Sequence, residues 1–390
     1  MTVARIHILE THSSPPWLTP RAAYVHVPFC AHHCGYCDFA IATGQDHLIE
    51  LYIDALEAEL STLKQPQPIS TLYIGGGTPT HLNPSQLARM FRSIRCWLDL
   101  SPGYEFSIEA NPGTLTADKV AVLAEHQVTR VSLGAQSFQP HLLRALERDH
   151  EPDDVAPAVE LIKRYIGQVS LDLIFAAPGQ SEDDWHDDLR RAMSFGPDHI
   201  STYGLTYEKG TPLWKQWQRG EIKPLEEDDE LKLYALAIDT LEQAGFEHYE
   251  ISNFSLPDKR SRHNQVYWAN EAYFGFGMGA ARYVDGRREL NTRDLREYIR
   301  RCLAGESPVF QSEKLGPQER ARETLAVQLR RCDGVNRARF IEQTGYDLDA
   351  VASAAIARNL ERGLLVETDD NVYLSRRGKY VADAVIRDLL

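Results

Sequence analysis

Short β-type segments alternate with helical segments through most of the chain, and this alternation constrains the fold more than any other feature. The predicted strands span 22–28, 70–76, 104–110, 129–135, 168–176, 199–205 and 246–251. Between the first two strands, residues 46–64 place apolar side chains at helical spacing. A second helix is predicted over 84–98, with Asn83 as its cap. Strands that alternate with helices predict a parallel sheet, either open or closed into a barrel.

The alternation of strands and helices ends at about residue 300. Residues 317–335 and 349–365 carry helical patterns, and residues 365–390 indicate a short two-stranded wing followed by a helix. The sequence therefore predicts three parts: an N-terminal tail over 1–21, an α/β barrel over 22–300, and a smaller helical, winged-helix-like domain over 301–390.

The composition of the chain limits the classes of partner it can bind and indicates its cellular location. The net charge is -14, from 56 acidic and 42 basic residues, which argues against nucleic acid and anionic lipid as partners. No apolar run reaches 18 residues, so stable membrane insertion is not expected. The first 20 residues lack the pattern of a secretory signal. Six cysteines in 390 residues are too few for a disulfide framework, and Cys96, Cys302 and Cys332 are interpreted as core thiols, so a cytoplasmic location is predicted.

Three of the six cysteines fall within the stretch "YVHVPFCAHHCGYCDFA", residues 24–40. Cys30, Cys34 and Cys37 have the spacing of a metal or iron–sulfur site. One interpretation is structural zinc, with His26, His32 or His33 as the fourth ligand. The other is a [4Fe–4S] cluster held by three thiolates, which leaves one iron open for a small molecule.

Polar residues follow the predicted strands at the ends that a barrel uses for its site. The glycines of "GGGTPT", 75–80, would allow a ligand to approach backbone N–H groups, although no Gly-Lys-Ser/Thr of a P-loop follows. Glu109, Gln136 and Asp172 lie at or near the ends of three successive strands, and Arg148 follows a short helix. Each alone is explained by a cap or a surface ion pair, but together they form a series at one rim.

The loop C-x3-C-x2-C, with Tyr36 just before its third cysteine, resembles that of radical SAM proteins. The resemblance implies a partial (β/α)6 barrel, a [4Fe–4S] cluster on Cys30, Cys34 and Cys37, an electron donor for that cluster, and S-adenosylmethionine on the open iron. It also implies a set of residues that bind S-adenosylmethionine: Tyr24, Tyr36, Gly76, Gly77, Thr78, Glu109, Gln136, Arg148 and Asp172.

The order of the motifs resembles one branch of this family, which contains oxygen-independent coproporphyrinogen III oxidases and heme chaperones. The oxidase loop carries one more cysteine, at the position where Phe39 stands here, and this difference favours the chaperones. "HNQVYW", 263–268, matches the H-N-x-x-Y-W motif of the chaperones. The resemblance implies heme binding by four residues: His263, Asn264, Tyr267 and Trp268. An imidazole can ligate heme iron, and aromatic faces can stack on a porphyrin.

The function expected from this resemblance is to hold heme as cargo and deliver it to an apo-hemoprotein. The alternative is an enzyme, either an oxygen-independent coproporphyrinogen III oxidase or another radical SAM enzyme that acts on a tetrapyrrole. Cleavage of S-adenosylmethionine is compatible with both. The sequence leaves the oligomeric state open.

Overall fold

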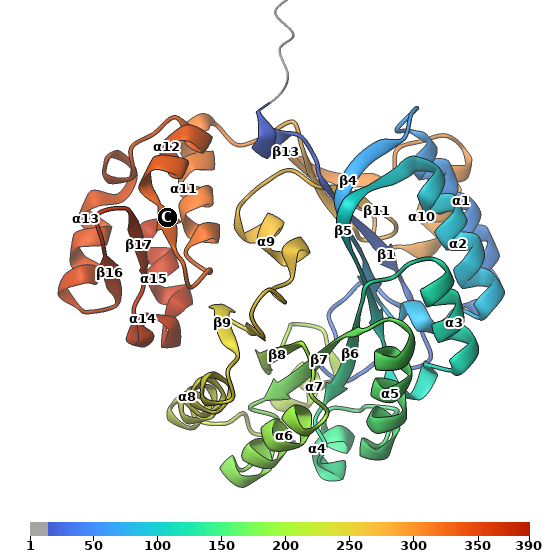
Figure 1. The fold of residues 1–390 in the computed structure, drawn as a ribbon, viewed down its shortest axis with the longest axis horizontal. Coiled ribbons are helices and arrows are strands. Elements are labelled where there is room, and N and C mark those ends of the chain that lie inside the picture. The colour runs from blue at the N-terminus through green and yellow to red at the C-terminus, as the bar shows by residue number, and fades with distance from the viewer. Residues whose placement is uncertain (1–14) are drawn as a thin grey trace, which may run out of the picture.

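The computed structural model describes residues 15–390, so the predicted tail over 1–21 lies mostly outside it. A nine-stranded sheet has the order β11-β1-β4-β5-β6-β7-β8-β10-β9 (Figure 1). Its six central strands are parallel to one another. They are β1 (Ala22–Val27), β4 (Gln67–Gly76), β5 (Leu98–Ala110), β6 (Arg130–Gln136), β7 (Gln168–Phe175) and β8 (His199–Gly204). The predicted parallel sheet is confirmed.

The two edges of the sheet do not pair with each other, so the barrel is partial, as expected. β11 (Phe274–Phe276) adds to β1 in parallel, whereas β10 (Asn253–Ser255) pairs antiparallel with β8 and with β9 (Glu247–Glu250). The sequence pattern did not predict β10 or β11, because three-residue strands are too short to show a period.

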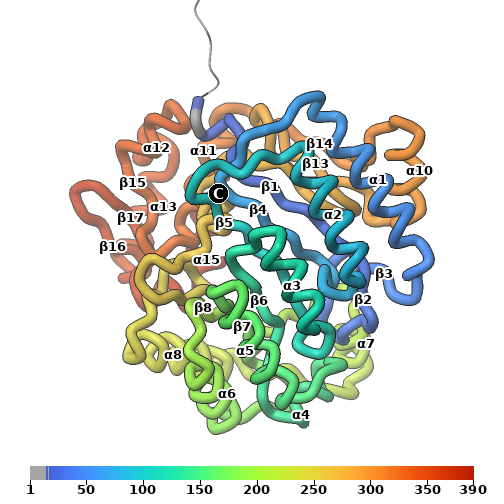
Figure 2. Tube along the Cα trace, turned by 45° about the vertical axis from the view of Figure 1, so that its right-hand side comes forward, coloured from blue at the N-terminus to red at the C-terminus, as the bar shows by residue number. Residues whose placement is uncertain are grey.

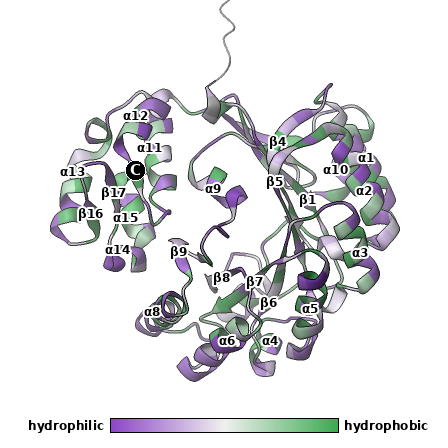
Figure 3. Cartoon of the chain, in the orientation of Figure 1, coloured by the Kyte–Doolittle hydropathy of each residue, from purple (hydrophilic) through white to green (hydrophobic). Residues whose placement is uncertain are grey.

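Helices cover the outer face of the sheet (Figure 2). They are α1 (Ile49–Ser61), α2 (Pro84–Trp97), α3 (Ala117–Glu125), α4 (Pro140–Ala145), α5 (Val155–Tyr165), α6 (Glu182–Ser194) and α8 (Glu227–Gln243). Apolar and polar residues alternate along them (Figure 3), and the apolar ones enter one large core with the strands. The capping box that joins Asn83 and Gln86 starts α2 as predicted. Cys96 on α2 is exposed, so its interpretation as a core thiol is wrong, whereas Cys302 is buried.

Shorter elements connect these parts. They are β2 (Phe29–Cys30), β3 (Ala42–Thr43), α7 (Pro212–Gln218), and the 3-10 turns η1 (Pro16–Leu18), η2 (Asp46–Leu48), η3 (Pro79–His81), η4 (Pro112–Thr114) and η5 (Pro152–Asp154). Within residues 15–390, no helix combines the length and the apolar character needed to cross a membrane.

The C-terminal part has a core of its own, with buried residues from Ala321 to Leu389. Its helices are α11 (Pro317–Gln328), α12 (Arg337–Thr344), α13 (Leu348–Glu361), α14 (Arg376–Tyr380) and α15 (Ala382–Leu389). The two wing strands predicted within 365–390 are β16 (Leu365–Glu367) and β17 (Asn371–Leu374), and β15 (Val335–Asn336) adds a third strand to this sheet. The predicted domain limit at 300/301 falls within α10 (Leu295–Leu303), which packs on α1, and the domain boundaries stay a prediction.

A small antiparallel sheet and α9 lie between the barrel and the C-terminal helices. The sheet contains β12 (Ala281–Val284), β13 (Arg287–Asn291) and β14 (Val309–Glu313). α9 (Arg262–Trp268) contacts both β4 and α11 (Figure 1). The Glu105 carboxylate on β5 accepts hydrogen bonds of 3.0 Å from the backbone N–H groups of Arg262 and His263. Because these N–H groups have no partner within the helix, Glu105 fixes where α9 begins.

The buried carboxylate of Glu59 joins three distant segments. It accepts hydrogen bonds from Gly277 N at 2.8 Å, Asn291 Nδ2 at 2.7 Å and Tyr298 Oη at 2.6 Å. α1 is thereby tied to the turn after β11, to the end of β13 and to α10. Burial raises the pKa of Glu59, and these three donors oppose that rise.

We expect Glu59→Ala to lower the free energy of unfolding by about 3 kcal/mol, because it removes the carboxylate that accepts from three buried donors, and only Asn291 keeps a second acceptor, Gly277 O. Glu59→Gln should cost less, since its amide oxygen still accepts. The exposed Glu160→Ala on α5 serves as the control. Urea unfolding of the three variants measures the difference, and equal stability of Glu59→Ala and Glu160→Ala would contradict the role of Glu59.

Candidate functional site

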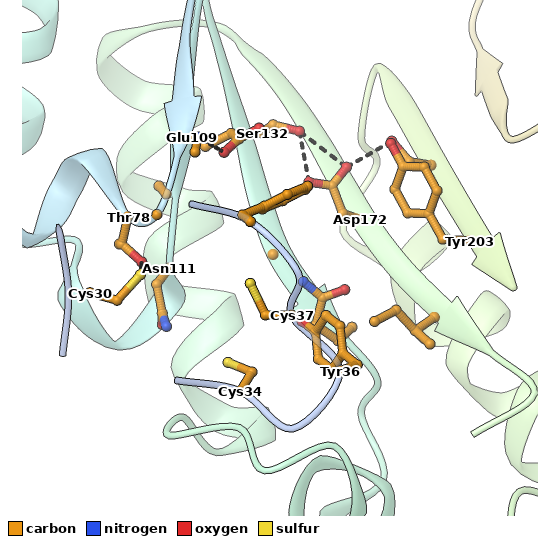
Figure 4. Close-up of a pocket in the computed structure, with 18 of the residues that line it drawn as sticks. Cys30, Cys34, Tyr36, Cys37, Thr78, Glu109, Asn111, Ser132, Asp172 and Tyr203 are labelled. Atoms are coloured by element: carbon orange, nitrogen blue, oxygen red, sulfur yellow. Dashed lines mark hydrogen bonds between the residues drawn. The ribbon is translucent and has the colours of Figure 1, made fainter. Parts of the chain in front are cut away.

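A cavity of about 440 Å³ opens at the carboxyl ends of the parallel strands. Parallel pairing brings these strand ends to one edge, which is where open α/β sheets and barrels hold ligands. Cys30, Cys34 and Cys37 lie on one side of this first cavity, and Glu109 and Asp172 lie across it (Figure 4). Residues from five strands and the loop after β1 therefore meet at a single site.

The three cysteines are all unpaired, and polar groups contact two of their sulfur atoms. Thr78 Oγ1 lies 3.5 Å from Cys30 Sγ, and Arg148 Nη1 donates to Cys34 Sγ at 3.3 Å. Burial raises the pKa of Cys30 to about 12 and that of Cys37 to about 11. Both thiols are therefore protonated without a bound cation, and a metal group must displace their protons on binding.

The donor set fits an iron–sulfur cluster better than a zinc ion. Structural zinc needs four ligands within about 2.0–2.3 Å of one point, and within residues 15–390 no three His, Cys, Asp or Glu side chains converge in that way. Of the three histidines considered as a fourth ligand, His26 has hydrogen-bond partners at both ring nitrogens, and His33 Nε2 lies 3.0 Å from Cys37 O. His32 lines the cavity, but it does not complete a group of ligands around one point. A cluster offers a different iron to each thiolate, so its ligands stand apart along one wall.

The glycines of the "GGGTPT" turn are required by the packing of the protein itself. Gly76 has a φ of 113°, and a Cβ there would lie 2.5 Å from the His26 ring. A Cβ on Gly77 would lie 2.7 Å from the carbonyl oxygen of Pro28.

The backbone N–H groups of this turn are already used inside the protein. They donate from Gly76 to Glu109 Oε2 at 2.9 Å, from Gly77 to Val27 O at 2.8 Å and from Thr78 to Phe29 O at 2.9 Å. The expectation that a ligand approaches backbone N–H groups at this turn is therefore wrong for Gly76, Gly77 and Thr78, whose N–H groups already have partners within the protein. The groups of this turn that could bind a ligand are its carbonyl oxygens and the Thr78 hydroxyl.

Two partly buried carboxylates, one on β5 and one on β7 with β6 between them, face the cysteines, and each is held by neutral donors. Glu109 accepts from Tyr73 Oη and from Gly76 N, both at 2.9 Å. Asp172 accepts from Ser132 Oγ at 2.9 Å and from Ser201 Oγ at 2.7 Å. Burial raises the pKa of Glu109 to about 7 and also raises that of Asp172. Both are acceptors suited to ligand hydroxyl or ammonium groups.

Gln136 and Arg148 complete the predicted rim. Gln136 ends β6 with a φ of 63°, a left-handed backbone that is uncommon outside glycine and concentrates at functional sites. Its side chain folds back over Gly134, where an added Cβ would lie 2.8 Å from Gln136 Nε2. Arg148 Nη2 donates to Gly134 O at 3.0 Å while Nη1 contacts Cys34.

All the predicted cofactor residues except Tyr24 line the first cavity, including Tyr36. Tyr24 stacks on Tyr73 at a centroid distance of 6.2 Å, and Tyr73 is the one that lines this cavity. Sequence reasoning also missed several residues of its wall: Asn111, Ser132, Ser201 and Tyr203. The signal was present, because Ser132 and Ser201 occur at alternate strand positions that share the inner face with Gln136 and Tyr203.

A second cavity of about 580 Å³ lies beside the first. It is bordered by β1, α9, β12, β13 and α11, and Tyr24, Tyr267 and Trp268 are among its lining residues. Asp38 and Phe39 line both cavities. Phe39 is 64% exposed. The segment that follows Cys37 thus separates the two cavities.

The four residues of the predicted heme motif have different surroundings. Tyr267 and Trp268 line the second cavity, and Asn264 lines the first. His263 is fully buried and lines neither. Its Nδ1 lies 2.9 Å from Thr71 Oγ1, and its Nε2 lies 2.7 Å from Tyr267 Oη. Burial lowers the pKa of His263 to about 3, so the imidazole is neutral at physiological pH. Heme binding by this motif stays a prediction.

Comparisons with known proteins agree with this geometry. Residues 24–192 match the radical SAM superfamily, and residues 315–381 match the HemN C-terminal domain. The fold also resembles the solved structure of coproporphyrinogen III oxidase (HemN) from Escherichia coli, a radical SAM enzyme. The TM-score is 0.84 over 96% of this chain and 90% of that one, at 21% identity, so the likeness concerns the fold alone. Fold and site define a radical SAM protein.

Known proteins that are similar to this chain over nearly its whole length identify the branch of the radical SAM class to which it belongs. The chain is 36% identical to heme chaperone HemW of Bacillus subtilis (strain 168), over 94% of this chain and 98% of that protein. It is 29% identical to heme chaperone HemW of Escherichia coli (strain K12), over 95% and 98% of the two chains. The chain belongs to the heme chaperone HemW family.

We expect Glu109 to make the stability of the ligand-free protein depend on pH. Its folded pKa of about 7 lies above the ordinary value of 4.5, so its contribution is complete below pH 4.5 and is lost as the pH rises through 7. The decline should reach up to about 3 kcal/mol and disappear in Glu109→Gln. Urea unfolding between pH 4.5 and 8 tests this, with Glu160→Gln as the control. Parallel curves for the wild type and Glu109→Gln would refute it.

Proposed function

We propose that this protein is a heme chaperone that binds a [4Fe–4S] cluster and S-adenosylmethionine in the first cavity and delivers heme to an apo-hemoprotein. The observation that carries the proposal is the position of α9. This helix bears the H-N-x-x-Y-W motif and lines both the cavity with the three cysteines and the cavity beside it. The names of the HemW relatives support heme as the cargo.

Cys30, Cys34 and Cys37 are proposed to hold the cluster, with one iron left for S-adenosylmethionine. When bound, the cluster supplies one electron to the sulfonium group of that cofactor, and the protein supplies position and a dry site. Thr78 and Arg148 contact two of the three sulfur atoms, and such contacts tune the reduction potential of a cluster. An electron donor that reduces the cluster is a further expected partner.

The remaining wall of the first cavity suits the polar parts of S-adenosylmethionine. Glu109 and Asp172 can accept from ribose hydroxyl or ammonium groups, and the carbonyl oxygens of Gly76 and Gly77 can accept from the ammonium group. Arg148 has the charge to bind a carboxylate. Tyr36 and Gln136 complete the proposed site. The wall between the two cavities has Phe39 in place of a further thiol, which supports a holder of heme over an oxidase.

Delivery requires that the acceptor binds heme more tightly than the holder does, since the differential affinity drives the transfer. An open cavity on the surface is consistent with a cargo that must leave. The acidic net charge of -14 argues against nucleic acid as the partner. A cytoplasmic location follows from the use of cysteine and is part of the proposal.

We expect the heme-loaded protein to transfer heme to an apo-cytochrome, which absorption spectra of the acceptor after separation would measure. Under anaerobic conditions, the reconstituted protein with S-adenosylmethionine and a reductant should leave coproporphyrinogen III unchanged. Heme retention in the presence of a competent acceptor, or conversion of coproporphyrinogen III to protoporphyrinogen IX, would contradict the proposed function.

We expect Cys37→Ser to abolish the cluster, because two thiolates and a poor hydroxyl ligand replace three thiolates. Cys96→Ser is a matched control, because Cys96 is exposed and lines neither cavity. Iron and sulfide per chain after anaerobic reconstitution should approach four each in the wild type and in Cys96→Ser. A full complement in Cys37→Ser would show that the cluster ligands lie elsewhere.

A further inference from the structure

We propose that the second cavity is the binding site of the heme cargo. A flat macrocycle with carboxylate side chains would lie against the aromatic walls of this cavity, and Arg293 would bind one carboxylate. This inference rests on the proposed function, since it names the place and the recognition of the heme. It adds a residue outside the H-N-x-x-Y-W motif and a chemical rule for which tetrapyrroles are accepted.

The walls of the second cavity suit a planar apolar ligand. Five aromatic side chains line it, from β1, from the loop after Cys37 and from the segment around α9: Tyr24, Phe39, Tyr267, Trp268 and Tyr273. Leu290 and Val327 add apolar surface. Its volume of about 580 Å³ lies within the range of cavities that bury cofactor-sized ligands.

The first cavity is the less suitable place for this cargo. S-adenosylmethionine is proposed to occupy it, together with the cluster on Cys30, Cys34 and Cys37. Its inner wall carries the carboxylates of Glu109 and Asp172, which would repel the propionates of heme. The second cavity has one lining carboxylate, Asp38, and two arginines, Arg288 and Arg293.

The two arginines differ in how far they are already engaged. Arg288 is paired with Glu323, and its Nη2 also donates to Asn270 Oδ1 at 3.2 Å. The Arg293 side chain is 53% exposed and contacts Asp38 through Nη2 alone, at the backbone oxygen and, at 3.5 Å, at Oδ1. A guanidinium has five N–H donors, so Arg293 keeps donors free for a second carboxylate at the edge of the cavity.

His263 is buried behind the wall of the second cavity, so we infer that the porphyrin contacts the aromatic side chains of this wall and that the His263 imidazole does not ligate its iron. Both nitrogens of His263 are engaged, and Tyr267 stands between this residue and the second cavity as one of its lining residues. His263 therefore acts as a positioning residue for Tyr267 in this structure. It follows that a porphyrin without iron should bind the same cavity.

Metal-free protoporphyrin IX and its dimethyl ester are the probes, titrated against the full-length protein by fluorescence. We expect the wild type to bind the free dicarboxylate about tenfold more tightly than the ester. Arg293→Ala should weaken binding of the dicarboxylate by about tenfold and leave the ester unchanged. Arg296→Ala, an exposed arginine three residues away that lines neither cavity, should behave as the wild type. Ala281→Trp, which fills the cavity, should weaken both probes.

The outcomes separate this inference from the proposed function. A wild-type protein that binds neither hemin nor protoporphyrin IX overturns the proposed function. A second outcome is a protein that binds hemin, but whose affinity for both porphyrins is unchanged by Arg293→Ala, by esterification and by Ala281→Trp. This outcome is compatible with the proposed function and contradicts binding of the cargo in the second cavity. Equal losses for the ester and the dicarboxylate in Arg293→Ala overturn the carboxylate contact. Thermal unfolding of each variant shows that the chain is folded.

Discussion

Parallel pairing of the six strands from β1 to β8 is the constraint on which the rest of this structure depends. Because the strands run the same way, their carboxyl ends lie at one edge, and each following loop begins there. The cysteine loop leaves β1, the glycine turn leaves β4, and Gln136 ends β6. Residues that are more than 140 positions apart, such as Cys30 and Asp172, thereby line one cavity. Without the sheet, these side chains would have no common location.

Buried carboxylates connect this sheet to the rest of the chain. Glu59 binds donors from three segments, and Glu105 caps the start of α9. A buried carboxylate is costly unless donors surround it, so each such group selects one arrangement of the segments that supply those donors. Glu105 thus determines where α9 lies, and with it the positions of Tyr267 and Trp268.

The loop after the cysteines gives the two cavities a common wall. Asp38 and Phe39 follow Cys37 directly, and both line each cavity. His26, which contacts the carbonyl of Ala40, also packs against the glycine turn at Gly76. A change in the packing of this loop would therefore alter the shape of both cavities. The site proposed for the cluster and the site proposed for the cargo therefore share the segment that directly follows Cys37.

The sequence by itself determined the parallel sheet, the main helices and the three cysteines, because hydrophobic period and motif spacing are local properties of the chain. It also placed Glu109, Gln136, Arg148 and Asp172 at one rim, since strand ends in such a fold share an edge. Only the tertiary structure decided that Tyr24 lines the second cavity, that His263 is buried behind Tyr267, and that Cys96 is exposed. It alone revealed β10 and β11, which are too short to show a period. These features depend on which distant segments pack against one another, and hydrophobic period and motif spacing, which are local, do not specify that packing.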